Sequence, residues 1–176
     1  MELRPTRVDG VALVVTQSYR DERGSFERAF CQSTFAAAGI SFAVRQASIS
    51  TNLKAGTLRG LHYQRAPHPE AKLVRCIAGR VFDAVVDLRP QSPTFRAWHG
   101  LELAPDAGLA LYIPPGVAHG FLSLDDDSVL HYMMDADHVP AASAGVRWDD
   151  PAFAIDWPAC PTTMAPRDAS YPDFTP

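Results

Sequence analysis

The sequence predicts an all-β fold, either a β-sandwich or a jelly roll, in one domain spanning residues 1–176. The chain contains 15 Pro and 11 Gly, and these residues separate short apolar runs rather than long amphipathic stretches. Several of those runs alternate apolar and polar residues or are rich in Val, Ile, Phe and Tyr, which is typical of strands. A chain of 176 residues suits one hydrophobic core, and 47% hydrophobic residues can fill it.

The predicted strands follow one another along the chain. They cover Val11–Val15, Ala47–Ser50, Lys72–Ile77, Arg80–Leu88, Arg96–Leu103, Gly108–Ile113 and Ser128–Met134. In the strand over 80–88, Asp83 and Asp87 share one face and the other face is apolar, so this strand is expected to line a polar cavity or the solvent. A short helix is predicted over Ser33–Gly39, and the Pro-rich tail after Trp157 is predicted to be a loop. Helices are too few for a doubly wound α/β fold.

Charge and composition exclude several classes of partner. With 16 Lys and Arg against 20 Asp and Glu, the net charge is −4, which disfavours binding to nucleic acid or to a membrane surface. No apolar run approaches the roughly 20 residues that span a bilayer, and no signal peptide is recognised. Three cysteines form an odd, sparse set, so we expect no disulfide framework, a cytoplasmic location and a buried packing role for each cysteine.

The densest group of reactive side chains follows Gly56. The run Gly56–Gln64 contains Arg59 and His62, and Lys72 comes soon after it. Histidine suits proton abstraction near neutral pH, an ammonium can stabilise an enolate oxygen, and a guanidinium matches phosphate oxygens. A single His is more often a satisfied core residue, and charged strand ends are often only solvated. Because all three types occur together, a functional role is favoured here.

Other candidates are weaker when each is taken alone. Pro114 and Gly116 precede His119 at the spacing of the second cupin motif, which aims a His into a small barrel but also serves turn chemistry. Strand alternation puts Tyr132 on the opposite face from His131 and Met133, and a Tyr among apolar neighbours is more often a packing residue than an acid. Arg23 lies in a predicted turn where it can reach an anion, and Asp168 can orient an imidazole or simply be solvated.

A metal site is not expected. The first cupin metal motif needs His-x-His followed by Glu, whereas this chain has His62 and Gln64, then Glu70 and Lys72. The ammonium of Lys72 repels a metal ion, and His62 with His119 are too few ligands.

The whole pattern resembles the dTDP-4-dehydrorhamnose 3,5-epimerase family. The similar segments run in family order from about residue 20 to residue 174 and include Asp21–Phe26, Gly56–Gln64, Lys72–Arg75, Phe82–Arg89, Ser92–Phe95, Ile113–Phe121, Gly145–Pro151 and Ile155–Pro158. The resemblance implies a cupin-type jelly roll with short peripheral helices, a homodimer, no cofactor, and an isomerase that epimerises a nucleotide-linked 4-keto-6-deoxyhexose, with dTDP as the nucleotide.

The resemblance also implies the roles of individual residues. His62 matches the base that removes the proton beside the ketone, Asp168 the carboxylate behind it, Tyr132 the acid on the other face of the sugar, and Lys72 the group that holds the enolate oxygen. The residues expected to contact the substrate are Arg23, Gln46, Ser48, Arg59, His119, His138 and Arg167.

Some ligand contacts depart from the family pattern. His138 replaces a Tyr that stacks on the base, Ser143 replaces a Glu, and Arg28 replaces a Glu after the first turn. The run Gln46–Ser50 lacks the usual Asp or Asn. The carbon inverted and the sugar therefore stay open, and so do three alternatives: a related 3-epimerase, a 3,4-ketoisomerase on another nucleotide sugar, and a non-catalytic sugar-binding cupin.

Overall fold

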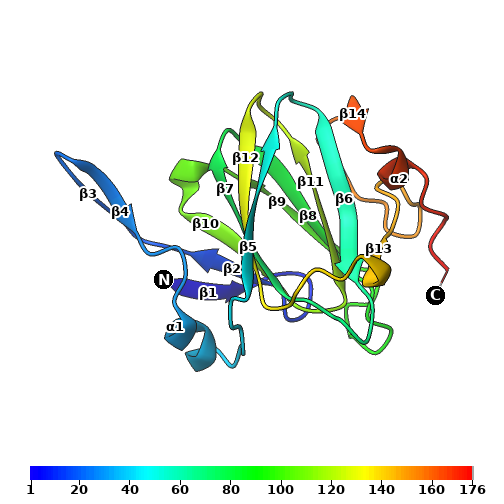
Figure 1. Cartoon of the computed structure of the whole chain (residues 1–176), viewed down its shortest axis with the longest axis horizontal. Helices are drawn as coiled ribbons and strands as arrows, with labels where there is room; N and C mark the ends of the chain where they lie inside the picture. The colour runs from blue at the N-terminus through cyan, green and yellow to red at the C-terminus, as the bar shows by residue number, and fades with distance from the viewer. Residues whose placement is uncertain (176) are drawn as a thin grey trace.

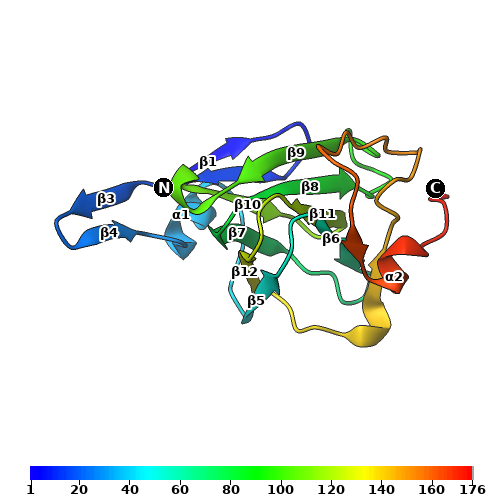
Figure 2. The same cartoon turned by 90° about the horizontal axis from the view of Figure 1, so that it is seen from above.

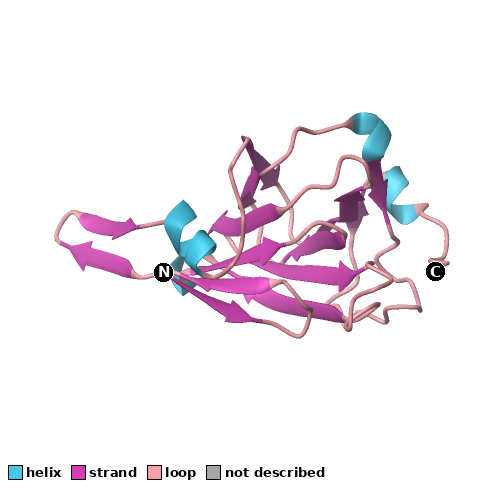
Figure 3. Ribbon diagram, turned by 90° about the horizontal axis from the view of Figure 1, so that it is seen from below, coloured by secondary structure: helices cyan, strands magenta, loops and turns pink. Residues whose placement is uncertain are grey.

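The computed structural model describes residues 1–175, which form two facing β-sheets with short peripheral helices (Figures 1 and 3). In spatial order, the first sheet contains β1 (Glu2–Pro5), β2 (Ala12–Val15), β10 (Leu109–Ile113), β7 (Lys72–Ala78), β12 (Ser128–Met134) and β5 (Gln46–Asn52). The second contains β13 (Ser143–Gly145), β6 (Thr57–Gln64), β11 (Val117–Ser123), β8 (Val81–Asp87) and β9 (Trp98–Leu103), and β14 (Thr163–Met164) pairs with β6. The predicted jelly-roll class is confirmed.

The main core lies between the two sheets. Val74 and Leu130 from the first sheet pack with Val85 and Phe121 from the second, and each is almost fully buried. These residues alternate with outward-facing ones along their strands, so both sheets turn one apolar face inward. The strands are nearly all antiparallel, and the exception is the short β14–β6 pair. Of the strands that carry candidate site residues, β7, β11 and β12 contribute side chains to this core.

Two segments stand outside the sandwich. The hairpin of β3 (Ser18–Asp21) and β4 (Gly24–Glu27) projects away from the body, as all three ribbon views agree (Figures 1, 2 and 3). The helix α1 (Gln32–Ala37) confirms the predicted one, and Phe35 on it is fully buried in a second apolar cluster on the outer face of the first sheet. Gly39 follows it with φ +78°, a conformation that ends a helix readily.

All seven predicted strands are present as β2, β5, β7, β8, β9, β10 and β12. The strand predicted from Arg96 begins only at Trp98, because Arg96 has φ +65°, outside the extended region. The tail predicted as a loop also contains β14 and α2 (Pro166–Ala169). The burial expected of all three cysteines is wrong for Cys160, which is exposed, and Cys31 is only half-buried.

The expectation for the strand over 80–88 is also wrong in one respect. Both faces of β8 are covered, and Asp83 and Asp87 are fully buried rather than solvated. The cost of burying the Asp87 carboxylate is compensated, because the Arg89 guanidinium and the hydroxyls of Ser92 and Thr94 all donate hydrogen bonds to it. Burial alone would raise the pKa of Asp87, but these donors outweigh it and lower the pKa to about 2.

Acid should remove this stabilisation in a defined window. The folded-state pKa of about 2 lies below the ordinary value of 3.8, so the ionised carboxylate stabilises the fold at neutral pH and the effect is lost as pH falls from 4 to 2. The shift is worth about 2 kcal/mol. We expect Asp87→Asn to lower the free energy of unfolding by at least that much at pH 7, measured by urea titration, with the difference from the unsubstituted protein shrinking toward pH 2. A difference independent of pH would contradict this assignment.

Candidate active site

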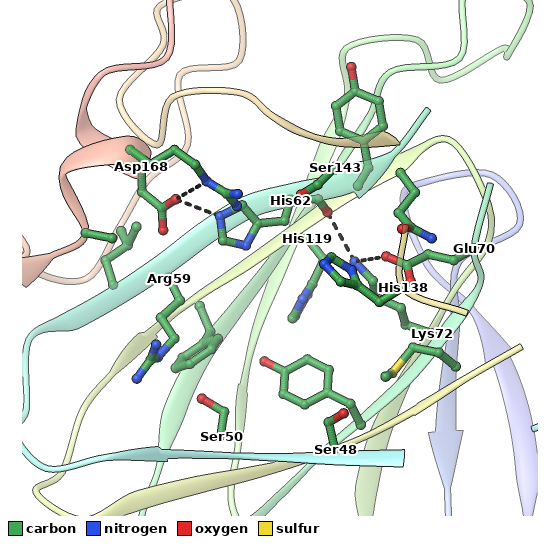
Figure 4. Close-up of a pocket in the computed structure, with 18 of the residues that line it drawn as sticks. Ser48, Ser50, Arg59, His62, Glu70, Lys72, His119, His138, Ser143 and Asp168 are labelled. Carbon is green, nitrogen blue, oxygen red and sulfur yellow. Dashed lines mark hydrogen bonds and ion pairs between the residues drawn. The ribbon is translucent and has the colours of Figure 1, made fainter. Parts of the chain in front are cut away.

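A cavity of about 660 Å³ opens between the two sheets, and Figure 4 shows the polar side chains that converge on it. Its wall includes ten of the eleven predicted site residues: Gln46, Ser48, Arg59, His62, Lys72, His119, Tyr132, His138, Arg167 and Asp168. Arg59, His62 and His119 come from the second sheet, whereas Lys72 and Tyr132 come from the first. The cavity therefore has walls from two separate layers of the fold.

Arg23 is the predicted residue that the structure does not bring to this cavity. It lies at the turn of the β3–β4 hairpin, its side chain is 85% exposed, and it pairs with the carboxylate of Asp21 at 2.5 Å. The hairpin projects away from the body (Figure 1), and Arg23 is not among the residues that line the cavity of its own chain.

A local irregularity in β6 aims both Arg59 and His62 into the cavity. Residues three apart on a regular strand face opposite ways. Between them, Gly60 has φ +135°, and a Cβ there would lie 2.4 Å from the Cα of Gly120 on β11. The register between β6 and β11 shifts at this point. Glycine at 60 thus permits the close approach that turns Arg59 and His62 toward the same space.

His62 and Asp168 form a hydrogen-bonded pair. The His62 Nε2 lies 2.7 Å from Asp168 Oδ1, and the backbone N–H of Gly60 donates to Asp168 Oδ2 at 3.1 Å. Asp168 is buried on α2, which by itself would raise its pKa, but the contacts with His62, Gly60 and Arg167 hold that pKa below its usual value. An ionised carboxylate only accepts, so Nε2 of His62 carries the shared proton and Nδ1 is left as a base.

Lys72 contacts the backbone of His62, on the side of the residue away from Asp168's hydrogen bond to the ring. Its ammonium donates to the backbone oxygen of His62 at 3.3 Å and lies 3.0 Å from the Glu70 carboxylate (Figure 4). The two side chains are only 12% and 9% exposed. An ammonium has three N–H groups, so one of them is still available to a ligand in the cavity.

Tyr132 approaches from the first sheet, across the cavity from His62. Its ring packs edge-on to His119 with centroids 5.9 Å apart, and it also contacts the main core. Burial raises the pKa of Tyr132 well above its ordinary value, the carboxylate of Asp83 raises it further, and Arg59 opposes them. Its phenol is therefore protonated at neutral pH and can donate a proton.

His119 is held by a second buried carboxylate. Its Nε2 lies 2.8 Å from Asp83 Oδ2, and both side chains are at least 96% buried. His119 and His62 are register partners on β11 and β6, so the two imidazoles stand side by side on one sheet. This pairing explains why Asp83 faces inward despite its charge.

Arg59 is aimed by a neutral partner. Its Nε donates to Asn52 Oδ1 at 2.8 Å, and the amide of Asn52 donates in turn to the backbone oxygens of Ser50 and Ser128. The Asn52 side chain is thereby fixed within the sheet. Arg59 keeps most of its guanidinium donors for an anionic ligand.

Sequence reasoning missed three residues of this site: Glu70, Asp83 and Asn52. The signal for Glu70 was available, because residues two apart on an extended chain share a face and Glu70 precedes Lys72 by two. Asp83 and His119 are far apart in sequence, and so are Asn52 and Ser128, so only the strand pairing reveals these two contacts. Among residues 1–175, no three His, Cys, Asp or Glu side chains gather in a way that suits a metal ion.

Taken together, the cavity offers a base backed by a carboxylate, a protonated phenol on the opposite wall, an ammonium, and a guanidinium with free donors. A base and an acid on opposite faces of a bound molecule can remove a proton from one face and return one to the other. An ammonium in the same cavity can stabilise the anion that exists between the two proton transfers.

Comparison with known proteins points to one family. The family model described as dTDP-4-dehydrorhamnose 3,5-epimerase matches residues 5–175. The dTDP-4-dehydrorhamnose 3,5-epimerase of Methanothermobacter thermautotrophicus is 40% identical over 153 residues, which cover 87% of this chain and 82% of that protein. The dTDP-4-dehydrorhamnose 3-epimerase of Streptomyces niveus is 38% identical over 169 residues, covering 96% and 81%.

The similarity extends to three dimensions. A crystal structure of the 3,5-epimerase from Legionella pneumophila, in complex with dTDP-4-keto-L-rhamnose, superposes with a TM-score of 0.91 at 35% sequence identity. The superposition covers 97% of this chain and 90% of that one. The jelly-roll fold and nearly the whole chain length are thus shared with proteins of this kind.

Proposed function

Because the chain belongs to the dTDP-4-dehydrorhamnose 3,5-epimerase family and is thus an isomerase, we propose that it epimerises a dTDP-linked 4-keto-6-deoxyhexose at C3, C5 or both. The observation that carries this proposal is the placement of His62 and Tyr132 on opposite walls of one cavity. We propose one epimerase domain over residues 1–176 that works without a cofactor in the cytoplasm and binds neither nucleic acid nor membranes. No helix among residues 1–175 is long and apolar enough to span a bilayer.

Each step has a side chain suited to it. The C–H bond beside the C4 ketone breaks, its proton goes to Nδ1 of His62, and the electron pair moves onto the C4 oxygen. Lys72 donates to that oxygen and stabilises the enolate, while Asp168 stabilises the imidazolium. Tyr132 then donates its proton to the opposite face of the carbon, which inverts the centre. Solvent afterwards takes the proton from His62 and returns one to the phenolate of Tyr132.

The remaining cavity residues bind the substrate. Arg59 and Arg167 are suited to the diphosphate, because a guanidinium matches phosphate oxygens. Gln46, Ser48, His119 and His138 supply further hydrogen-bonding groups from both sheets and the loop after β12, which suit sugar hydroxyls and the nucleoside.

Deuterium exchange tests the function directly. The protein is incubated in D₂O with dTDP-4-keto-6-deoxyglucose, and NMR follows the label and the configuration at each carbon. We expect deuterium at C3, C5 or both, together with an inverted product. Absence of exchange with dTDP- and CDP-linked 4-keto sugars would refute the epimerase, and sugar binding without exchange would favour the non-catalytic cupin.

The same spectra distinguish the related reactions. The similarity to a protein named dTDP-4-dehydrorhamnose 3-epimerase keeps inversion at C3 alone open. A 3-epimerase gives label and inversion only at C3, whereas a 3,4-ketoisomerase moves the carbonyl from C4 to C3. Both begin with the same enolate, so the product and not the exchange separates them.

We further propose that the protein is a homodimer. On the outer face of the first sheet, Ile49 is 66% exposed and Ile77 is 45% exposed, and Leu53, which follows the end of β5, is 69% exposed. The base of the projecting hairpin lies beside this face, because Glu27 pairs with Arg75 there. A second copy covering the patch would bury these residues, and the hairpin would then bring Arg23 to the partner's cavity instead of its own.

A charge in the patch should separate the two copies. We expect Ile49→Asp to elute as a monomer in size-exclusion chromatography with light scattering, where the unsubstituted protein elutes as a dimer, because two carboxylates would be buried at a symmetric interface. Glu22→Asp on the hairpin turn serves as a control that keeps the charge. A dimeric Ile49→Asp protein would place the interface elsewhere.

A further inference from the structure

Glu70 has no part in the steps above, yet its carboxylate lines the cavity. Its side chain is only 9% exposed, and it lies 3.0 Å from the ammonium of Lys72 (Figure 4). A carboxylate removed from water to this extent is costly unless its partner compensates it. The pair therefore forms one neutral unit in the wall of a cavity whose expected ligand is an anion.

The backbone next to Glu70 is fixed, because both the N–H and the carbonyl oxygen of Ala71 are hydrogen-bonded to Asp135. The N–H of Ala71 donates to Asp135 Oδ1 at 2.7 Å, and the N–H of Asp135 donates to the oxygen of Ala71 at 3.3 Å. Ala71 itself is buried. Glu70 and Lys72, on either side of Ala71, are consequently held at a constant spacing on one face of the chain.

The cations of the cavity differ in their partners. Arg59 donates to Asn52 Oδ1 and more weakly to the oxygen of Thr51, and both of these acceptors are neutral. Lys72 has the Glu70 carboxylate at 3.0 Å and is 12% exposed, whereas Arg167 lies 3.7 Å from Asp168 and is 57% exposed. An incoming phosphate group is attracted to Arg59 without opposition, whereas at Lys72 it meets the negative charge of Glu70 as well.

We propose that Glu70 determines the direction in which the substrate binds, by excluding phosphate from Lys72 and by holding one N–H of that ammonium for the keto oxygen. This inference rests on the proposed epimerase function for the identity of the keto group. The diphosphate is directed to the Arg59 end, and the uncharged keto sugar is directed to the Lys72 end. Glu70 is thus a specificity-determining and positioning residue that acts through Lys72.

Inorganic pyrophosphate is the probe for the exclusion of phosphate. We expect Glu70→Gln to bind pyrophosphate at least about tenfold more tightly than the unsubstituted protein in calorimetry, because the amide keeps the shape and removes the charge. Adding Lys72→Met to Glu70→Gln should abolish the gain. Glu102→Gln removes a carboxylate that pairs with Arg80 outside the cavity and should leave the affinity unchanged. Equal affinities for Glu70→Gln and the unsubstituted protein would overturn the proposal.

A second comparison does not require the Glu70 variant to fold. If Glu70 screens Lys72, then Lys72→Met alone should leave pyrophosphate affinity within about twofold of the unsubstituted value. A marked loss of affinity in Lys72→Met would overturn the proposal, because Lys72 would then already bind phosphate. Neither pyrophosphate measurement depends on turnover. Both therefore test the role of Glu70 even if the protein proves not to be an epimerase.

Turnover provides the readout for positioning. We expect Glu70→Gln to lower kcat by about 10- to 100-fold with little change in KM, because the ammonium loses its fixed place while Arg59 still binds the nucleotide. Glu70→Asp keeps the charge and should recover part of the rate. An unchanged kcat in a folded Glu70→Gln protein would contradict the positioning role.

Discussion

With His62 replaced by alanine, the protein is expected to lose proton exchange at the carbon beside the ketone, with kcat/KM falling by about 10²- to 10⁴-fold. The substitution removes the cavity imidazole that the Asp168 carboxylate on α2 orients, and it leaves the buried Asp168 with the Gly60 N–H but without His62 as a hydrogen-bond partner. NMR in D₂O measures the effect directly, since it counts label per unit time whether or not the product is inverted.

His68→Ala is a suitable control, because His68 is exposed and its side chain does not line the cavity. It should exchange at the unsubstituted rate. Circular dichroism must show that His62→Ala is folded. Exchange by folded His62→Ala at the unsubstituted rate would assign the base to another residue, with His119, its register partner, as the first candidate.

Tyr132→Phe is expected to separate exchange from inversion. The phenylalanine ring keeps the packing against His119 and the core but removes the proton donor on the wall opposite His62. His62 can still take a proton and return one to the same face, so deuterium should enter the substrate while the inverted product forms at least about 10²-fold more slowly. The ratio of labelled substrate to inverted product, followed by NMR, reports the effect.

Tyr112→Phe is the matched control, because Tyr112 is buried in the second apolar cluster on the outer face of the first sheet. Its ratio of labelled substrate to product should equal that of the unsubstituted protein. If Tyr132→Phe inverts the sugar at the normal rate, a different donor serves the second face. A loss of exchange along with inversion would instead mean that Tyr132 shapes the cavity for the base.

The sequence allowed the strands with clear alternation to be predicted, and Ser128–Met134 was predicted at its observed ends. It did not indicate β6 or β11 as strands, and a glycine interrupts each of them, Gly60 in β6 and Gly120 in β11. Those glycines in fact bring the two strands together, and the resulting irregularity places Arg59 and His62 in one cavity. Strict alternation would have separated them, so this part of the site depends on a tertiary contact.

In the candidate site, too, local sequence patterns predicted some residues, whereas others depend on contacts between distant segments. Lys72 and His62 stood out by residue type and by resemblance, whereas the partners that hold the site, Asp83 and Asn52, were recognisable only once strand pairing was known. For Arg23 the prediction failed in another way. The motif that contains Arg23 was recognised, but the structure keeps this residue outside the cavity of its own chain. Local pattern identified reactive groups, and long-range pairing decided which of them meet.

His62 and Tyr132 are mounted on different layers of the sandwich, and the apolar side chains between the layers act as spacers. Protein interiors are packed as densely as organic crystals, so the thickness of that filling fixes how far apart the layers stand. The stereochemical outcome therefore depends on core residues such as Val74 and Val85, which do not line the cavity. To admit a bulkier hexose, one could therefore enlarge core side chains between the sheets and leave the residues that line the cavity unchanged.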